Sequence, residues 1–279
     1  MRRRLPRQSE VRNAPGFRVD AAQLLPGALA ALTVAEIGRI VLPAGNERCA
    51  AGDMFDIERR QADSGGHAVS LLIEGDVPWL DRLGAHLAQG RIEVRGSSGD
   101  HTGFRMTGGE LRVDGNSGDF TGCQMSGGRL TVDGHSGDFA AGPLPGDMEG
   151  MTGGTLTIHG KTGARLGDRM RRGLVLVGGD AGECAASRLV AGTIGIAGKL
   201  GPHFGYGMRR GTLLLLQAPA SLPPTFSDGG QGFDVFWALF VRSLAAEIAP
   251  FSTLKESALP RRYTGDLAVD GRGELLVVG

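Results

Sequence analysis

One short pattern returns seven times between Gly90 and Gln217, and it limits what this chain can fold into more than any other feature. Each early copy opens with a glycine and continues with alternating apolar and polar residues, as in Gly90-Arg-Ile-Glu-Val-Arg-Gly96. The opening glycines are Gly90, Gly109, Gly128, Gly154, Gly173, Gly192 and Gly211, so every step is 19 residues except one of 26. A fixed period of this kind indicates stacked units, each of which buries its apolar face against its neighbours.

Each copy has the pattern of one short strand. Ile92 and Val94 alternate with charged residues, and Leu111 and Val113 do the same, which is a period of two. A 19-residue unit cannot hold a strand and a crossover helix, because that connection needs a dozen or more residues. The sequence therefore predicts an all-β fold, a right-handed parallel β-helix of about seven to eight turns. At the usual strand spacing the rod is roughly 30 Å long.

Glycine and methionine recur at fixed places between these strands. Gly96, Gly99 and Gly103 form a spacing that returns in later units, with Ala141 and Ala186 at the last position of two of them. Glycine there provides positive φ at corners or lets adjacent backbones approach closely. Three residues before each next opening glycine we expect one interior stack of adaptable side chains, made of Met106, Met125, Met151, Met170, Leu189 and Met208.

The flanks divide the chain into three parts: an N-terminal arm and lead-in over 1–68, the β-helix over 69–217, and a C-terminal segment over 218–279 that wraps the rod. Thr33 and Glu36 form a capping-box pattern, which predicts a short helix near 34–39. We expect strands at 39–42 and 54–58 on either side of a Gly45-Asn46 turn. The C-terminal part is expected to hold a helix over 233–248 and a hairpin over 267–278.

The outward strand positions change character along the rod. In the early turns they are charged, and Arg91, Glu110 and Arg129 alternate in sign on neighbouring strands. In the later turns they are apolar, since they include Leu174, Leu176, Leu214 and Leu216. A strand that is apolar on both faces must be covered on both. We therefore expect the helix over 233–248 to pack on this end of the sheet, while a partner protein covers what remains.

Three aspartates share one repeat position. Asp100, Asp119 and Asp138 would stack about 5 Å apart on adjacent turns. One hypothesis is a carboxylate pair for acid–base or cation chemistry. The favoured interpretation is a corner aspartate that faces solvent and bonds the backbone of its own loop. The six histidines do not gather at one repeat position, and no nucleophile motif or metal-binding motif occurs.

The repeats resemble the β-helical domain at the C-terminus of the glutamate synthase large subunit. From about residue 17 onward the chain resembles the C subunit of formylmethanofuran dehydrogenase, in Gly45-Asn46 followed by Gly52-Asp-Met-Phe55, in the repeats, and in the tail Arg262–Gly271. In methylotrophic bacteria the homologous subunit belongs to a formyltransferase/hydrolase complex. That complex moves a formyl group between tetrahydromethanopterin and a methanofuran analogue and then releases formate.

The resemblance implies a non-catalytic scaffold subunit of such a complex. Its partners would be amidohydrolase-like, dehydrogenase B-like and formyltransferase subunits, and those partners would hold the methanofuran-type coenzyme and the metal, with no cofactor in this chain. The alternatives are a subunit of a true molybdenum or tungsten dehydrogenase, or a module that binds the tail of the coenzyme. An Arg-rich, Lys-poor composition favours a bacterial source and hence the hydrolase complex.

The amino-acid composition favours a cytoplasmic protein that is a subunit of a larger assembly. Lysine plus arginine and aspartate plus glutamate number 30 each, and only 5% of residues are aromatic, so nothing points to nucleic acid. No apolar run reaches the length of a membrane span. Cys49, Cys123 and Cys184 are scattered without a C-x-x-C pair, as in a reducing compartment. The N-terminal arginines Arg2, Arg3, Arg4, Arg7 and Arg12 fit a disordered arm or one that binds an acidic partner.

Arginines concentrate in the later turns. A solvated edge is the commonest meaning of such a cluster. The functional alternative is an anion-binding face or a contact with another subunit, because the guanidinium fork suits carboxylates. The candidates are Arg169, Arg171, Arg172, Arg209 and Arg210. The resemblance provides one ligand class, since methanofuran-type coenzymes carry a glutamate-rich tail.

Overall fold

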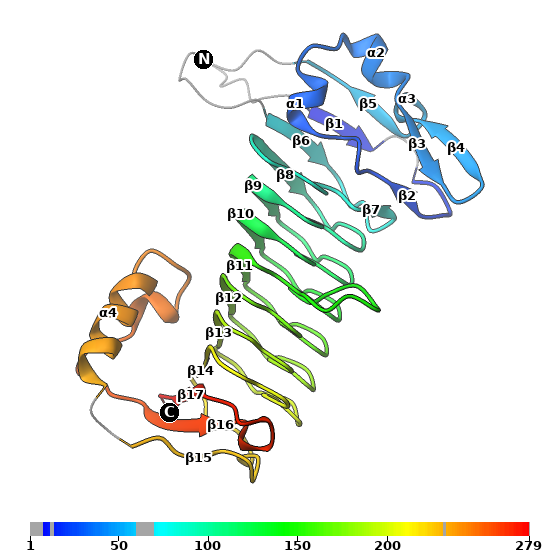
Figure 1. Ribbon diagram of the computed structural model, residues 1–279. Helices are drawn as coiled ribbons and strands as arrows, with labels where there is room; N and C mark the ends of the chain where they lie inside the picture. The colour runs from blue at the N-terminus through cyan, green and yellow to red at the C-terminus, as the bar shows by residue number, and fades with distance from the viewer. Residues whose placement is uncertain (1–7, 12–13, 60–69, 231–232, 279) are drawn as a thin grey trace.

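The chain forms a rod of stacked parallel rungs, with an N-terminal cap at one end and a C-terminal segment beside the other (Figure 1). The computed structural model describes residues 8–11, 14–59, 70–230 and 233–278. Consecutive rungs pair in parallel across a 13-stranded sheet, which confirms the parallel β-helix. The rungs are β6 (Ser70–Glu74), β8 (Arg91–Arg95), β9 (Thr107–Val113), β10 (Ser126–Val132), β11 (Gly153–Ile158), β12 (Leu174–Val177), β13 (Thr193–Ile196) and β14 (Thr212–Leu215).

The core of the rod is a set of ladders in register. Ile92 pairs with Leu111, and Leu111 pairs with Leu130 on the next rung, so like side chains stack along the axis. All three are fully buried. The predicted interior stack is confirmed, because every member has an exposed fraction of 0%: Met106, Met125, Met151, Met170, Leu189 and Met208.

The N-terminal cap extends the sheet and closes its first edge. β1 (Gln8–Val11) pairs in parallel with β6 and antiparallel with β5 (Phe55–Ile57). The short strand β2 (Val19–Asp20) pairs with β7 (Leu80–Asp81). Helix α1 spans Pro26–Leu29. Helix α2 spans Val34–Gly38, and the Thr33–Glu36 capping box is present, as the sequence predicted.

The lead-in differs from the prediction at its hairpin. The strand expected at 39–42 is β3 (Val41–Ala44), and it pairs with β4 (Glu47–Ala50), which the sequence reasoning missed. The two-residue Gly45-Asn46 turn joins these strands, and the short helix α3 (Ala51–Met54) then leads into β5. The boundary predicted at 68/69 lies outside the described residues, and so do the arginines of the predicted arm, Arg2, Arg3, Arg4, Arg7 and Arg12.

The C-terminal segment leaves the rod after β14, folds back and ends as a further rung. β17 (Gly273–Val277) pairs in parallel with β14, and β16 (Arg261–Gly265) pairs antiparallel with β17 and with β15 (Ser227–Asp228). The predicted hairpin over 267–278 is therefore wrong in its first strand. Leu267–Val269 is a 3-10 turn, η2, because the Asp266 carboxylate accepts the amide of Ala268 at 3.0 Å and so favours a turn.

The late apolar face is covered, as predicted, by the C-terminal helix. Leu176 and Leu214 are fully buried against Trp237, Val241 and Leu244. Leu174 and Leu216 are partly buried against the same cluster. Helix α4 spans Asp234–Leu244, shorter than the predicted 233–248.

A buried phenylalanine holds the segment after α4 against the sheet. After α4 the chain turns back into the 3-10 helix η1 (Phe251–Thr253), and Phe251 is fully buried in the same cluster. A Cβ on Gly195 would lie 2.8 Å from the Phe251 ring. The glycine on the outer face of β13 therefore makes room for this ring, which the sequence reasoning missed.

The early charged face is only partly a solvated ladder. Arg91 and Glu110 approach to 3.5 Å, as the alternation of charges predicted. Arg129 instead binds Glu247 through two hydrogen bonds of 2.8 and 3.1 Å. The side chain of Glu247 is only 9% exposed. A bidentate pair of this kind is directional, so it fixes the segment after α4 to rung β10.

Candidate functional site

The aspartate column is a hydrogen-bond ladder along the rod. The Oδ1 atom of Asp100 accepts the backbone amide of Asp119 at 3.0 Å, and Asp119 accepts that of Asp138 at 2.8 Å. Asp138 accepts the amide of Ala164 at 2.7 Å, and Asp81 begins the series by accepting that of Asp100 at 2.8 Å. Each carboxylate therefore satisfies a backbone donor of the next turn. The expectation that it bonds its own loop was wrong.

The surroundings of the column also favour a structural role. Arg18 forms ion pairs with Asp81, at 3.1 Å, and with Asp100. Burial raises the pKa of the Asp81 carboxyl. Burial lowers the pKa of the His101 imidazole, whose ring stacks on Phe120 at 4.8 Å, so His101 is neutral at pH 7. Within the described ranges no group of three His, Cys, Asp or Glu residues is placed to hold a metal ion.

The seven-residue insertion between turns, 143–149, is tied to the rod on both sides. The amide of Gln124 donates to the Asp147 carboxylate at 2.7 Å. Arg169 donates to the Asp147 carbonyl at 3.2 Å, and Arg171 pairs with Glu149 at 2.9 Å. Two of the five candidate arginines therefore hold this loop.

The other three candidate arginines point into solvent. Arg172, Arg209 and Arg210 are exposed, and none of them forms an ion pair with any described residue. Arg188 has a different role. It binds Asp168 through two hydrogen bonds, and the Asp168 side chain is 3% exposed, so this pair neutralises a buried charge. The five candidate arginines thus separate into two that bind the insertion and three without an ionic partner among the described residues.

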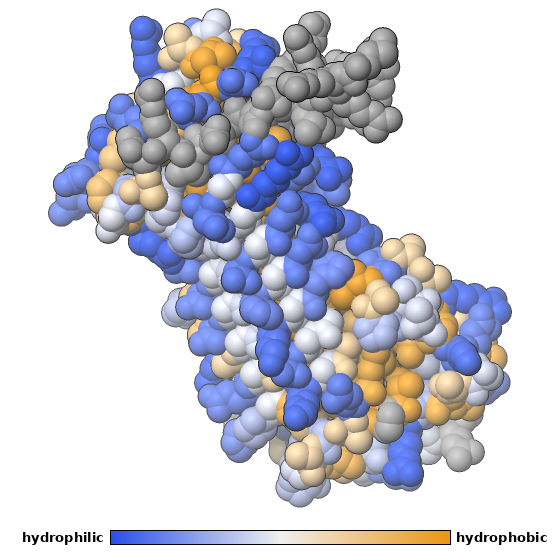
Figure 2. All heavy atoms as spheres, turned by 180° about the vertical axis from the view of Figure 1, so that it is seen from behind, coloured by the Kyte–Doolittle hydropathy of each residue, from blue (hydrophilic) through white to orange (hydrophobic). Residues whose placement is uncertain are grey.

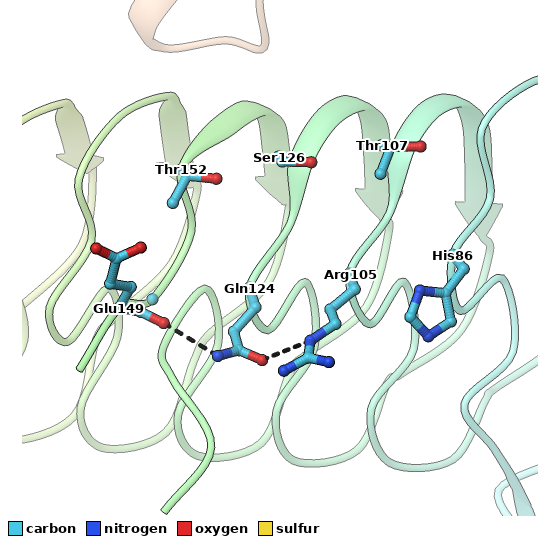
Figure 3. A pocket seen from close by; sticks show the side chains of 8 residues that line it. His86, Arg105, Thr107, Gln124, Ser126, Glu149 and Thr152 are labelled. Carbon is cyan, nitrogen blue, oxygen red and sulfur yellow. Dashed lines mark hydrogen bonds between the residues drawn. The ribbon is translucent and has the colours of Figure 1, made fainter. Parts of the chain in front are cut away.

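A polar groove of about 350 Å³ runs beside the insertion (Figure 3). Its floor carries one row of hydroxyls and one row of larger polar side chains from successive turns. Arg105 donates to Gln124 at 2.9 Å, and Gln124 donates to the Glu149 carbonyl at 3.3 Å. The lining residues are His86, Arg105, Thr107, Gln124, Ser126, Glu149, Gly150 and Thr152. These groups can hydrogen-bond a polar ligand or loop.

Sequence reasoning did not single out this groove, although a signal was present. Thr107, Ser126 and Thr152 share one repeat position, two residues before each opening glycine, and all three carry a hydroxyl. Leu144, in the insertion, packs against a buried cluster that contains Cys123. Burial raises the pKa of the Cys123 thiol to about 12. Because the thiolate is the reactive form, Cys123 is an inert filler.

Comparison with known proteins agrees with this architecture. The family model for the GXGXG motif matches residues 81–227. A chain in the X-ray crystal structure of the formyltransferase/hydrolase complex FhcABCD from Methylorubrum extorquens, in complex with methylofuran, superposes with a TM-score of 0.89 and 41% sequence identity. That alignment covers 98% of this chain and 99% of the solved chain.

Two curated relatives match over a shorter segment. The C subunit of the formyltransferase/hydrolase complex Fhc of Methylorubrum extorquens is 44% identical over 82 residues, which is 29% of each chain. The C subunit of tungsten-containing formylmethanofuran dehydrogenase 2 of Methanothermobacter thermautotrophicus is 31% identical over 89 residues. That match covers 32% of this chain and 33% of the relative. These sequence matches therefore span a third or less of the curated relatives' length.

The family follows from the two longest matches. The GXGXG model covers more than half of the chain, and the chain of the solved complex aligns over nearly its whole length at 41% identity. This chain therefore belongs to the GXGXG motif family and is a homologue of the C subunit of the formyltransferase/hydrolase complex.

Proposed function

We propose that this chain is a non-catalytic scaffold subunit of a formyltransferase/hydrolase complex that acts in methanofuran-linked one-carbon metabolism. The observation that carries the proposal is the whole-length match, at 41% identity and a TM-score of 0.89, to a chain of the FhcABCD complex. The geometry of the aspartate column is consistent with it, because those carboxylates bond the backbone of the rod.

The surface favours docking of partners. The outer side of α4 leaves Val235, Phe236 and Leu239 exposed at 69%, 42% and 60%. Apolar side chains gather over the C-terminal part of the molecule, whereas the rod beside it is polar (Figure 2). Contiguous apolar patches of this kind mark interaction sites on soluble proteins.

The partners, coenzyme and location belong to the same proposal. The partner subunits would be amidohydrolase-like, dehydrogenase B-like and formyltransferase chains, and they would bind the methanofuran-type coenzyme and the metal. The three cysteines Cys49, Cys123 and Cys184 are free, which supports a cytoplasmic location. No helix in the described part of the chain is long and apolar enough to cross a membrane.

A dehydrogenase parent complex has less support. The matched segment is 44% identical to the relative from the hydrolase complex and 31% identical to the relative from the tungsten dehydrogenase. A coenzyme-binding module remains testable through the three free arginines.

Co-expression with the other subunits of the complex tests the proposal. An affinity tag on this chain should retain the partner subunits in fixed ratio through gel filtration, and the isolated chain should not bind methylofuran. Elution of the wild-type chain alone at 29.1 kDa would contradict the scaffold role. Binding of methylofuran by the isolated chain, lost in Arg209→Ala/Arg210→Ala, would favour the coenzyme-binding module instead.

A further inference from the structure

Several arginines lie on one corner of the rod, at the residues just before Gly173, Gly211 and Gly273. The amide of Val190 donates to the Met170 carbonyl at 2.9 Å, and that of Arg209 donates to the Leu189 carbonyl at 2.8 Å, so these repeat positions stack on successive turns. The amide of Arg272 donates to the Arg209 carbonyl at 2.7 Å, which places Arg272 on the next rung. We call Arg171, Arg172, Arg209, Arg210 and Arg272 the basic corner.

The charge of the basic corner is not balanced within the described structure. Arg172, Arg209, Arg210 and Arg272 are exposed, and no described carboxylate pairs with them. Glu149 is already bound by Arg171 at 2.9 Å. The chain as a whole has equal numbers of basic and acidic residues, so this corner concentrates positive charge that is offset elsewhere on the molecule.

Two exposed side chains beside the arginines add the chemistry of a protein interface, one in the insertion between β10 and β11 and one in the turn before β14. Met148, in the insertion, and Tyr206 are each 68% exposed. The Tyr206 carbonyl accepts the backbone amide of Arg188 from the preceding turn. Arg169 contacts the Met148 sulfur. Methionine, tyrosine and arginine are enriched in protein interfaces, whereas a site for a small anion would not need the two apolar side chains.

We propose that the basic corner docks onto a carboxylate-rich surface of a partner subunit, with Met148 and Tyr206 as the apolar contacts. The inference rests on the proposed function and adds the chemistry of the partner. Guanidinium groups bind carboxylates in bidentate geometry, and complementary charge controls which surfaces associate. The four exposed guanidinium groups have no acidic partner among the described residues. Their positive charge is therefore complementary to a partner surface that presents carboxylates.

Charge reversal in the assembled complex tests this inference. Arg209→Glu/Arg210→Glu is expected to weaken binding of this chain to its partner subunits by about a hundredfold, because like charges then face each other. The matched control is Arg39→Glu/Arg48→Glu, which makes the same change in charge at two exposed arginines of the N-terminal cap. The control should bind like wild type. Wild-type binding should also weaken as salt increases, and this dependence should be smaller in the corner variant.

The outcomes separate the inference from the proposed function. If wild type assembles and the corner variant assembles equally well, the basic corner is not the interface, and the scaffold role stands. If wild type does not assemble, the proposed function itself fails. Equal losses in the corner variant and the control would overturn the inference, because they would reflect total charge. Co-purifying nucleic acid that only the corner variant loses would also overturn it.

Discussion

Leu214→Asp is expected to lower the free energy of unfolding by about 4 kcal/mol or more, because a large-to-small change at a buried leucine already costs about 2–5 kcal/mol and a buried carboxylate adds to that. Leu214 is fully buried between rung β13 and the added rung β17, where it pairs with Leu276. Trp237 and Leu244 of α4 cover it. The charge would force α4 away from the sheet.

Trp237 fluorescence measures this docking. Trp237 is fully buried and its indole donates to the Lys255 carbonyl at 3.2 Å, so its emission should be blue. Trp79 is also buried, and a Trp79→Phe background therefore isolates the signal. Leu214→Asp should shift the emission to the red. Solvated, red emission from the otherwise wild-type chain would contradict the docking of α4.

Glu110→Lys is the matched control on the uncovered part of the same sheet. The wild-type Glu110 side chain is 46% exposed and lies 3.5 Å from Arg91. Exposed ion pairs contribute about 0–1 kcal/mol, so this variant should leave Trp237 emission unchanged and the unfolding midpoint almost so.

Gly118→Val is expected to cost about 3 kcal/mol or more, because overpacking costs about 1–3 kcal/mol and losing the hydrogen bond from the Asp119 amide to the Asp100 carboxylate costs about 1 kcal/mol more. A Cβ on Gly118 would lie 2.0 Å from Oδ1 of Asp100 and 2.9 Å from both the Asp100 nitrogen and the Gly99 carbonyl carbon. The carboxylate can rotate away, but the backbone of the preceding turn cannot. Close approach, with no left-handed φ at this position, is what requires glycine.

Substitutions at the neighbouring aspartate provide a graded comparison. Asp119→Asn keeps an oxygen that can accept the Asp138 amide and should cost less than about 1 kcal/mol, whereas Asp119→Ala loses that bond and should cost about 1 kcal/mol. Urea midpoints and soluble yield should therefore fall in the order Asn, Ala, then Gly118→Val. A Gly118→Val protein that unfolds at the wild-type midpoint would refute the tight packing between turns.

The rod was predictable because each of its constraints is local and repeated. The alternation around Ile92 and Leu111 predicts the strand and its inward face, and the spacing of the opening glycines predicts the period. Both signals recur in the seven copies of the pattern. The left-handed corners were not predictable in the same way. His101, Phe120 and Cys184 share one repeat position with φ of 57–59°, yet they have no residue type in common. Hydrogen bonds between turns hold that conformation, such as the Phe120 amide to the Asp138 carbonyl at 2.8 Å.

The C-terminal segment was predicted less well because its contacts are not periodic. Apolar spacing identified α4 and the face it covers. It could not reveal that Phe251 fills the space left by Gly195, or that Glu247 reaches Arg129 across 118 residues of sequence. Such contacts depend on the path by which the chain returns to the rod. The spacing of residues within one segment does not predict that path.

The candidate site shows the same limit. Sequence correctly grouped the aspartates by repeat position, but which donor each carboxylate binds depends on the neighbouring turn. It also grouped five arginines, although two of them hold the insertion. Side chains of one type at one repeat position can have different partners, because the insertion breaks the symmetry of the rod at a single turn.

Formate release by the assembled complex tests most directly whether this chain is a scaffold without chemistry of its own. The variant replaces Asp100, Asp119 and Asp138 with asparagine, which keeps the hydrogen-bond acceptors of the ladder while removing all three carboxylates. We expect the variant complex to assemble with wild-type mass and to release formate at the wild-type rate. Loss of formate release from a fully assembled variant complex would contradict the scaffold role and place acid–base chemistry on this chain.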